Sequence, residues 1–116
     1  MKRYRFADLK DIRDGHFLKG IVPGDFIHVG GLGFKKPGER SHAAEGHAHV
    51  HDDCEVFVIL QGKGEMEING RRHPVTTGDI IVVEPGEDHH LIADLDDPCI
   101  NLWCHAGPGR HGEASP

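Results

Sequence analysis

The chain has few aromatic residues, few cysteines and no long hydrophobic run. One Trp, one Tyr and five Phe are its only aromatic residues among 116. No apolar segment approaches the roughly 20 residues of a membrane-spanning helix, and none follows the basic N-terminus as in a secretory signal. The three cysteines form no C-x-x-C pair, which favours buried thiols in a reducing compartment. We therefore expect a cytoplasmic protein with no membrane partner.

Positive charge is also scarce. Thirteen Lys and Arg residues stand against 19 Asp and Glu residues, so the net charge is −6 with neutral histidine. A nucleic-acid footprint requires a basic face, so no nucleic-acid partner is expected. Two residue types are instead abundant, with 16 glycines and 11 histidines. The glycines are typical of many short elements joined by tight turns.

Short apolar or alternating segments, separated by turn residues, predict eight or nine strands and no long helix. The main predicted strands are 16–22, 26–34, 50–60, 65–68, 71–76, 80–83, 89–95 and 99–105. Asn69-Gly70 is the strongest hairpin signal. Residues 6–12 form either one helical turn or an edge segment. The pattern predicts an all-β antiparallel sandwich or barrel over 16–106, preceded by an N-terminal segment (1–15) and followed by a flexible tail (107–116).

The strongest chemical signal is a run of histidines at a predicted strand. His49 and His51 project to one face, because strand side chains alternate, and Glu55 has the same parity. His89 is the candidate fourth ligand, since the turn before it can aim the side chain back into a barrel. Three neutral imidazoles and one carboxylate suit one divalent transition metal ion (Fe, Mn, Ni, Cu, Co or Zn). A solvated loop with incidental metal affinity is the alternative, but it leaves Glu55 and His89 unexplained.

These residues resemble the two sequence motifs of the cupin family, G-(x)5-H-x-H-(x)3,4-E-(x)6-G and G-(x)5-P-x-G-(x)2-H-(x)3-N. The matching residues are His49, His51, Glu55 and Gly62 in the first motif, and Gly78, Gly86 and His89 in the second. Ala43, Glu84 and Ala93 depart from the pattern, but none of these positions is a metal ligand in the family. The resemblance covers about residues 43 to 93.

The resemblance implies a double-stranded β-helix, the jelly-roll barrel of antiparallel strands. It also implies one divalent metal ion inside, held by His49, His51, Glu55 and His89, with one or two coordination positions left for water, oxygen or substrate. An open position of this kind distinguishes a catalytic site from a closed structural one. Cupins of this size commonly pair as homodimers.

Four further residues are candidates for the pocket. His42 and His47 precede the ligand strand and are candidate acid–base residues, with solvated loop positions as the alternative. Phe57 shares the face of Glu55 and is assigned to the substrate pocket. Trp103 is a candidate pocket wall, although periodicity alone leaves open which face of the last strand turns inward.

The favoured function is a small-molecule metalloenzyme of the dioxygenase type. A Lewis-acid isomerase or decarboxylase and a non-catalytic binding protein are the alternatives. Few aromatics and many histidines point to a small polar or anionic ligand. If Glu55 faces inward, then Val56, Val58 and Leu60 face outward. Three outward apolar side chains are unusual for a solvated sheet face, so we expect a homodimer that covers them.

Overall fold

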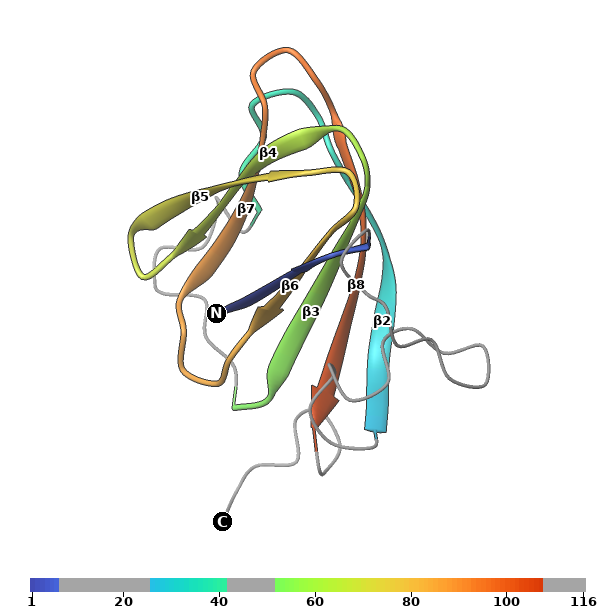
Figure 1. Cartoon of the computed structure of the whole chain (residues 1–116), viewed down its shortest axis with the longest axis vertical. Helices are drawn as coiled ribbons and strands as arrows, with labels where there is room; N and C mark the ends of the chain where they lie inside the picture. The colour runs from blue at the N-terminus through green and yellow to red at the C-terminus, as the bar shows by residue number, and fades with distance from the viewer. Residues whose placement is uncertain (7–25, 42–51, 108–116) are drawn as a thin grey trace.

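A computed structural model of the chain describes residues 1–6, 26–41 and 52–107. Its eight strands are β1 (Lys2–Arg5), β2 (Phe26–Lys35), β3 (Cys54–Gln61), β4 (Lys63–Ile68), β5 (Arg71–Thr76), β6 (Asp79–Val83), β7 (His89–Ala93) and β8 (Cys99–Gly107). They form a five-stranded sheet in the order β1-β6-β3-β8-β2 and a three-stranded sheet in the order β5-β4-β7 (Figure 1). Every pairing between these strands is antiparallel, so the all-β antiparallel prediction is confirmed.

Most predicted strands lie where the sequence places them, but two of them are shorter. The strand predicted over 50–60 begins at Cys54, because residues 52 and 53 form a bend in which Asp53 bonds to a neighbouring strand. The strand predicted over 89–95 ends at Ala93, because the Asp94 carboxylate accepts a hydrogen bond from the backbone N–H of Asp96. The strand predicted over 16–22 lies outside the described residues.

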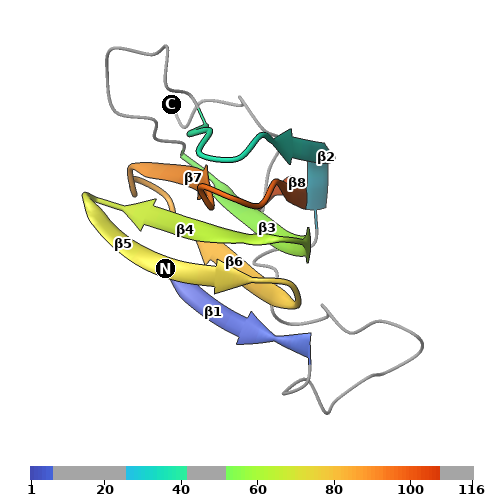
Figure 2. The ribbon, with the colours of Figure 1, turned by 90° about the horizontal axis from the view of Figure 1, so that it is seen from above.

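The first residues of the chain form an edge strand, whereas most of the segment predicted as a helical turn or an edge segment, residues 7–12, lies outside the described residues. β1 pairs with β6 along the outer side of the five-stranded sheet (Figure 2). Asp79, at the start of β6, is fully buried and pairs with Arg3 and Arg5 of β1. Its carboxylate also accepts a hydrogen bond from the backbone N–H of Thr76 at 2.9 Å. One buried carboxylate therefore joins β1, β5 and β6.

Two turns depend on backbone conformations that favour glycine. Asn69 and Gly70 have φ values of 49° and 82°, as the predicted β4–β5 hairpin requires. Gly62, the last residue of the first motif, has a φ of 87° between β3 and β4. A Cβ atom at Gly62 would lie 1.9 Å from the backbone oxygen of Pro98, so a side chain cannot fit there. This motif glycine is needed for the close approach of two chain segments.

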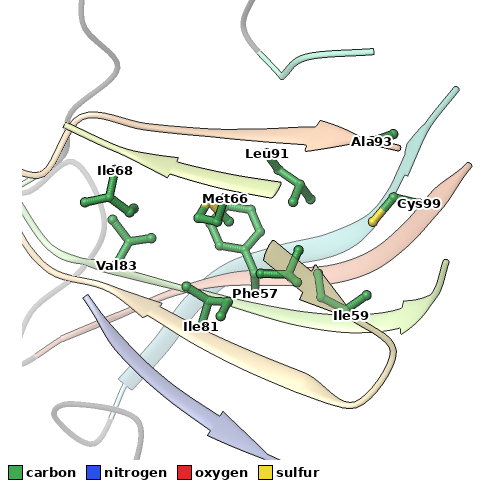
Figure 3. Packing of buried hydrophobic residues seen from close by; sticks show 10 residues of the cluster. Phe57, Ile59, Met66, Ile68, Ile81, Val83, Leu91, Ala93 and Cys99 are labelled. Atoms are coloured by element: carbon green, nitrogen blue, oxygen red, sulfur yellow. The ribbon is translucent and has the colours of Figure 1, made fainter. Parts of the chain in front are cut away.

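The hydrophobic core lies between the two sheets (Figure 3). Phe57 and Ile59 of β3 point into it, as their predicted parity requires, and meet Met66 of β4 and Leu91 of β7 there. Trp103 packs against the edge of the same cluster. This core holds the two sheets together, and Glu55 has the same inward parity as Phe57.

The opposite face of the five-stranded sheet carries a second apolar cluster. Its buried members are Cys54, Val56, Val58, Ile80, Val82 and Cys104, and Tyr4 packs against them. Val56 and Val58 face outward as predicted, but the single chain already buries them to 0% and 5% exposure. The expectation that a partner subunit must cover these two valines is therefore wrong. Leu60 alone of the three remains exposed, at 43%.

Candidate metal centre

The described residues contain half of the predicted ligand set. Glu55 and His89 lie within them, as do the predicted pocket residues Phe57 and Trp103. The other two predicted ligands, His49 and His51, lie outside the described residues. The same holds for the candidate acid–base residues His42 and His47.

Glu55 and His89 meet across the interior of the barrel. Glu55 is the second residue of β3 in one sheet, and His89 is the first residue of β7 in the other. His89 Nε2 lies 2.8 Å from Glu55 Oε1, and both side chains are more than nine-tenths buried. The fold therefore brings together two residues that are 34 positions apart and come from the two different motifs.

A third titratable side chain, His105, lies beside the pair. It is opposite Glu55 in the β3–β8 register, and its Nε2 atom is 3.5 Å from Glu55 Oε1. Its Nδ1 atom donates a hydrogen bond of 2.9 Å to Asp53 Oδ1. Neither Asp53 nor His105 is among the residues that the two motifs single out. In the sequence, His105 could be noticed only because it has the same strand parity as Trp103. The pairing of β3 with β8 that places His105 beside Glu55 is visible only in the tertiary structure.

The hydrogen bonds of the two histidines define which ring nitrogen faces Glu55. His89 Nδ1 donates to the backbone carbonyl of Glu87 at 3.0 Å, so a neutral His89 presents the lone pair of Nε2 to the Glu55 carboxylate. The hydrogen bond to Asp53 likewise places the proton of a neutral His105 on Nδ1, so the lone pair of its Nε2 atom also faces Glu55. Lone pairs that face one another in a buried space require a cation between them, either a proton or a metal ion. The donor chemistry therefore fits the metal ion that the motifs imply.

The pKa of His89 also indicates that a positive charge is favoured at this point of the barrel. Burial lowers the pKa of this imidazole, but its hydrogen bonds with Glu55 and the Glu87 carbonyl, together with the negative charges of Glu55 and Asp88, raise the pKa by more. The net pKa of His89 lies above its usual range. The Glu55–His89 pair therefore stabilises a cation at this point of the barrel.

Two aromatic rings flank the centre. Phe57 meets the His89 ring edge-on, with centroids 6.0 Å apart, and Trp103 meets the His105 ring edge-on at 5.9 Å. Phe57 is buried in the core, whereas Trp103 is partly exposed. The inward face of β8 is thus the one that carries Trp103 and His105, which settles the orientation that periodicity left open.

Two other titratable side chains, Cys104 and His90, lie away from the centre. Cys104 belongs to the outer cluster, on the opposite face of the sheet from Glu55, and burial raises the pKa of its thiol. His90 is buried, and its Nδ1 atom donates to the backbone carbonyl of Ser41 at 3.0 Å. Neither side chain shares the space between Glu55 and His89.

Within the three described ranges, no group of three or more His, Cys, Asp or Glu side chains is arranged to hold a metal ion. A cleft of about 660 Å³ lies elsewhere, along β4, β5 and β7. Its lining includes Arg3, Lys63 and Arg72, but each of these cations pairs with a carboxylate. The chemistry of the centre therefore depends on the Glu55–His89 pair rather than on this cleft.

Comparison with known proteins identifies the family. The sequence profile described as "Cupin domain" matches residues 36–105, which is more than half of the chain. The chain belongs to the cupin family. This cupin contains both motifs within the matched segment, and Glu55 and His89 occupy the motif positions that the resemblance assigned to metal ligands.

Solved structures show the fold of this cupin. A conserved protein with a double-stranded β-helix domain from Klebsiella pneumoniae is 26% identical, with a TM-score of 0.61 over 74% of this chain and 71% of that chain. A cupin protein from Bacteroides fragilis is 22% identical, with a TM-score of 0.59 over 75% of this chain and 69% of that chain. The predicted double-stranded β-helix is confirmed.

A curated relative matches over a shorter segment. The transcriptional activator RhaR of Escherichia coli is 33% identical over 49 residues, which is 42% of this chain and 17% of the relative. The matched segment is therefore less than a fifth of that protein. None of the described residues of the cupin forms a helix with the length and hydrophobicity needed to cross a membrane.

Proposed function

We propose that this cupin binds one divalent transition metal ion (Fe, Mn, Ni, Cu, Co or Zn) through His49, His51, Glu55 and His89, and acts on a small polar or anionic molecule. The observation that carries the proposal is the 2.8 Å approach of His89 Nε2 to Glu55 Oε1 inside the barrel. Each of these side chains is supplied by a different sheet and a different motif. An imidazole and a carboxylate in this arrangement are suitable donors for a first-row divalent metal ion.

Supporting hydrogen bonds orient the proposed ligands. The Glu87 carbonyl holds Nδ1 of His89, so Nε2 is available at the centre. Phe57 packs edge-on against the same ring and limits its rotation. Outer contacts of this kind fix the tautomer and orientation of metal-binding histidines. These contacts support His89 as a proposed metal ligand.

The proposed reaction is a dioxygenase-type oxidation of a small enol, phenol or thiol. The metal ion, when bound, supplies redox or Lewis-acid chemistry. The chain contributes Trp103 as a wall of the pocket, Phe57 against the edge of the His89 ring, and His42 and His47 as candidate acid–base residues. Lewis-acid isomerisation or decarboxylation is the alternative reaction at the same centre.

Elemental analysis tests the metal site directly. The protein is purified without a nickel column, and its metal content is measured per chain. One equivalent of a transition metal supports the proposal, whereas a metal-free protein that takes up no added metal contradicts it. Oxygen uptake with a small panel of enols, phenols and thiols then separates the oxidative reaction from the Lewis-acid reaction.

A second candidate function is non-catalytic binding of a small molecule. The observation that favours it is the 49-residue match to a transcriptional activator. Ligand-induced stabilisation, without oxygen uptake or conversion of the same compounds, would favour this candidate over the enzyme.

The proposal also covers the cellular location, the oligomeric state and the domain bounds of the protein. We propose a cytoplasmic homodimer, with residues 16–106 as the barrel, to whose five-stranded sheet β1 adds an edge strand, and with a tail over 107–116, of which Gly107 still belongs to β8. The cytoplasmic assignment is supported by Cys54, Cys99 and Cys104, which are all buried thiols with no disulfide.

A further inference from the structure

The inner face of β8 carries a buried polar side chain that lacks a hydrogen-bond partner. Asn101 is only 1% exposed, and neither its Oδ1 nor its Nδ2 atom makes a hydrogen bond within the part of the chain that the structure describes. Nearly all buried polar groups in folded proteins are paired, because burial without a hydrogen bond is unfavourable. The Asn101 carboxamide therefore has an unmet capacity both to donate and to accept.

Two glycines on β2 make room for the inward side chains of β8. Asn101 lies opposite Gly33 on β2 and Ile59 on β3. A Cβ atom at Gly33 would lie 2.7 Å from Asn101 Oδ1, so the carboxamide occupies space that a larger residue at Gly33 would fill. Trp103, two residues further along the same face, lies over Gly31, where a Cβ atom would be 3.4 Å from the indole ring. The carboxamide and the indole therefore lie side by side on the inner face.

We propose that Asn101 binds the small molecule on which this cupin acts, and that the bound group is a carboxamide or a similar neutral group that donates and accepts side by side. This inference rests on the proposed function and adds a specificity-determining residue to it. The side chain of Asn101 offers an N–H donor group and a carbonyl acceptor. A ligand carboxamide pairs with both atoms at once, whereas a carboxylate has no hydrogen to donate to Oδ1.

Asn101 lies at a distance from the Glu55–His89 pair, but on the same inner face. It precedes His105, the register partner of Glu55, by four residues, which is about 13 Å along an antiparallel strand. Trp103 lies between Asn101 and His105, meets the His105 ring edge-on and is partly exposed. A planar ligand can pack against the indole ring with its carboxamide at Asn101. Its other end then extends toward His105 and the proposed metal centre.

Isothermal titration calorimetry of the full chain with three matched phenols tests this inference. 4-Hydroxybenzamide carries the proposed group, 4-methylphenol has a methyl group in its place, and 4-hydroxybenzoate has a carboxylate. The unmodified protein is expected to bind the carboxamide about tenfold or more tightly than the other two, because only the carboxamide pairs with both atoms of Asn101. The carboxylate also tests Lys35, which lies opposite Cys99 at the end of β2 and would favour an anion. Equal or reversed affinities, or no binding of the three phenols, would overturn the proposal.

Three variants connect the preference to Asn101. Asn101→Leu keeps a branched side chain without polar atoms, and it is expected to bind 4-hydroxybenzamide and 4-methylphenol equally. Gly33→Ala places a methyl group against Asn101 Oδ1 and should reduce the preference as well. Gln61→Leu is the matched control, because Gln61 is an exposed carboxamide at the end of β3 and its loss should leave the preference unchanged. A preference that survives in Asn101→Leu, or that is lost in Gln61→Leu, would overturn the assignment.

Thermal melting shows whether each variant is folded. If Asn101→Leu does not fold, the unmodified protein and Gly33→Ala decide the outcome. Metal content, measured in the same samples, separates this inference from the proposed function. A metal-free protein that prefers the carboxamide would contradict the metal centre and support the role of Asn101. A metal-containing protein without the preference would overturn the role of Asn101 and leave the metal centre supported.

Discussion

His105 on β8 donates a 2.9 Å hydrogen bond to Asp53, which lies 52 positions earlier in the chain, immediately before β3. This bond turns the other nitrogen of the His105 ring toward Glu55. The two contacts link the bend before β3, the proposed ligand Glu55 and the last strand. The centre thus has a supporting residue on β8 in addition to the residues of the two motifs.

Glu55→Gln is expected to abolish stoichiometric metal binding. Glutamine matches the size of glutamate but lacks the charge that the buried imidazole faces. Metal affinity should fall by more than the roughly 10- to 100-fold that loss of an outer-shell contact costs. Elemental analysis and metal titration measure the effect. Glu65→Gln is the matched control, because Glu65 is 40% exposed on β4 and pairs only with Arg72 among its described salt-bridge partners. Retention of one equivalent of metal by Glu55→Gln would contradict the ligand assignment.

Asp53→Asn is expected to lower the free energy of unfolding by about 1–3 kcal/mol, because it removes the charge from a largely buried hydrogen bond to His105. Urea denaturation of the metal-free protein measures the difference. Asp97→Asn is the control, since Asp97 is 53% exposed and its 3.9 Å pair with Lys63 should contribute less than about 1 kcal/mol. Equal effects of the two substitutions would show that the Asp53–His105 bond adds no particular stability.

Asp79→Ala is expected to cost about 2–3 kcal/mol and to loosen β1. The fully buried Asp79 carboxylate bonds to Arg3, Arg5 and the backbone N–H of Thr76, and hydrogen bonds to charged groups are among the stronger ones. Chemical denaturation gives the free energy, and hydrogen exchange of the β1 amides gives the local effect. Glu84→Ala should change stability by less than about 0.5 kcal/mol, because Glu84 is 45% exposed and its pairs with Lys2 and the N-terminal ammonium are long, at 3.7 and 3.8 Å. Unchanged protection of β1 in Asp79→Ala would be evidence against this role.

The Arg40–Glu67 pair predicts a dependence of stability on pH. The hydrogen bond from Arg40, at 2.6 Å, holds the pKa of Glu67 below its usual range. A carboxyl group with a lowered pKa in the folded state stabilises the fold above its unfolded pKa of about 4.3. That stabilisation is lost as the pH falls through the lower folded pKa.

Comparison with Glu67→Gln isolates this contribution. The free energy of unfolding of the unmodified protein should exceed that of the variant by about 0.5–1 kcal/mol near neutral pH, because the pair is only partly exposed. The difference should shrink as the pH falls from about 5 toward 3. Denaturation curves at a series of pH values measure it, and a difference that stays constant into acid would refute the linkage.

The sequence by itself determined the fold class, most strand positions and the identity of the proposed ligands. Turn residues and alternating side chains are local signals, so the β4–β5 hairpin at Asn69-Gly70 and the inward parity of Phe57 were readable without a structure. The motif spacing likewise singled out Glu55 and His89, and the turn before His89 at Gly86, with a φ of 82°, is also a local signal.

Only the tertiary structure decided how distant segments meet. The β3–β8 register places His105 beside Glu55, and no local pattern encodes that register. The burial of Val56 and Val58 was also beyond the sequence, because parity tells which way a side chain points but not what covers it. The same apolar face is buried near β6 and exposed at Leu32, since exposure depends on the packing of the whole chain around the sheet.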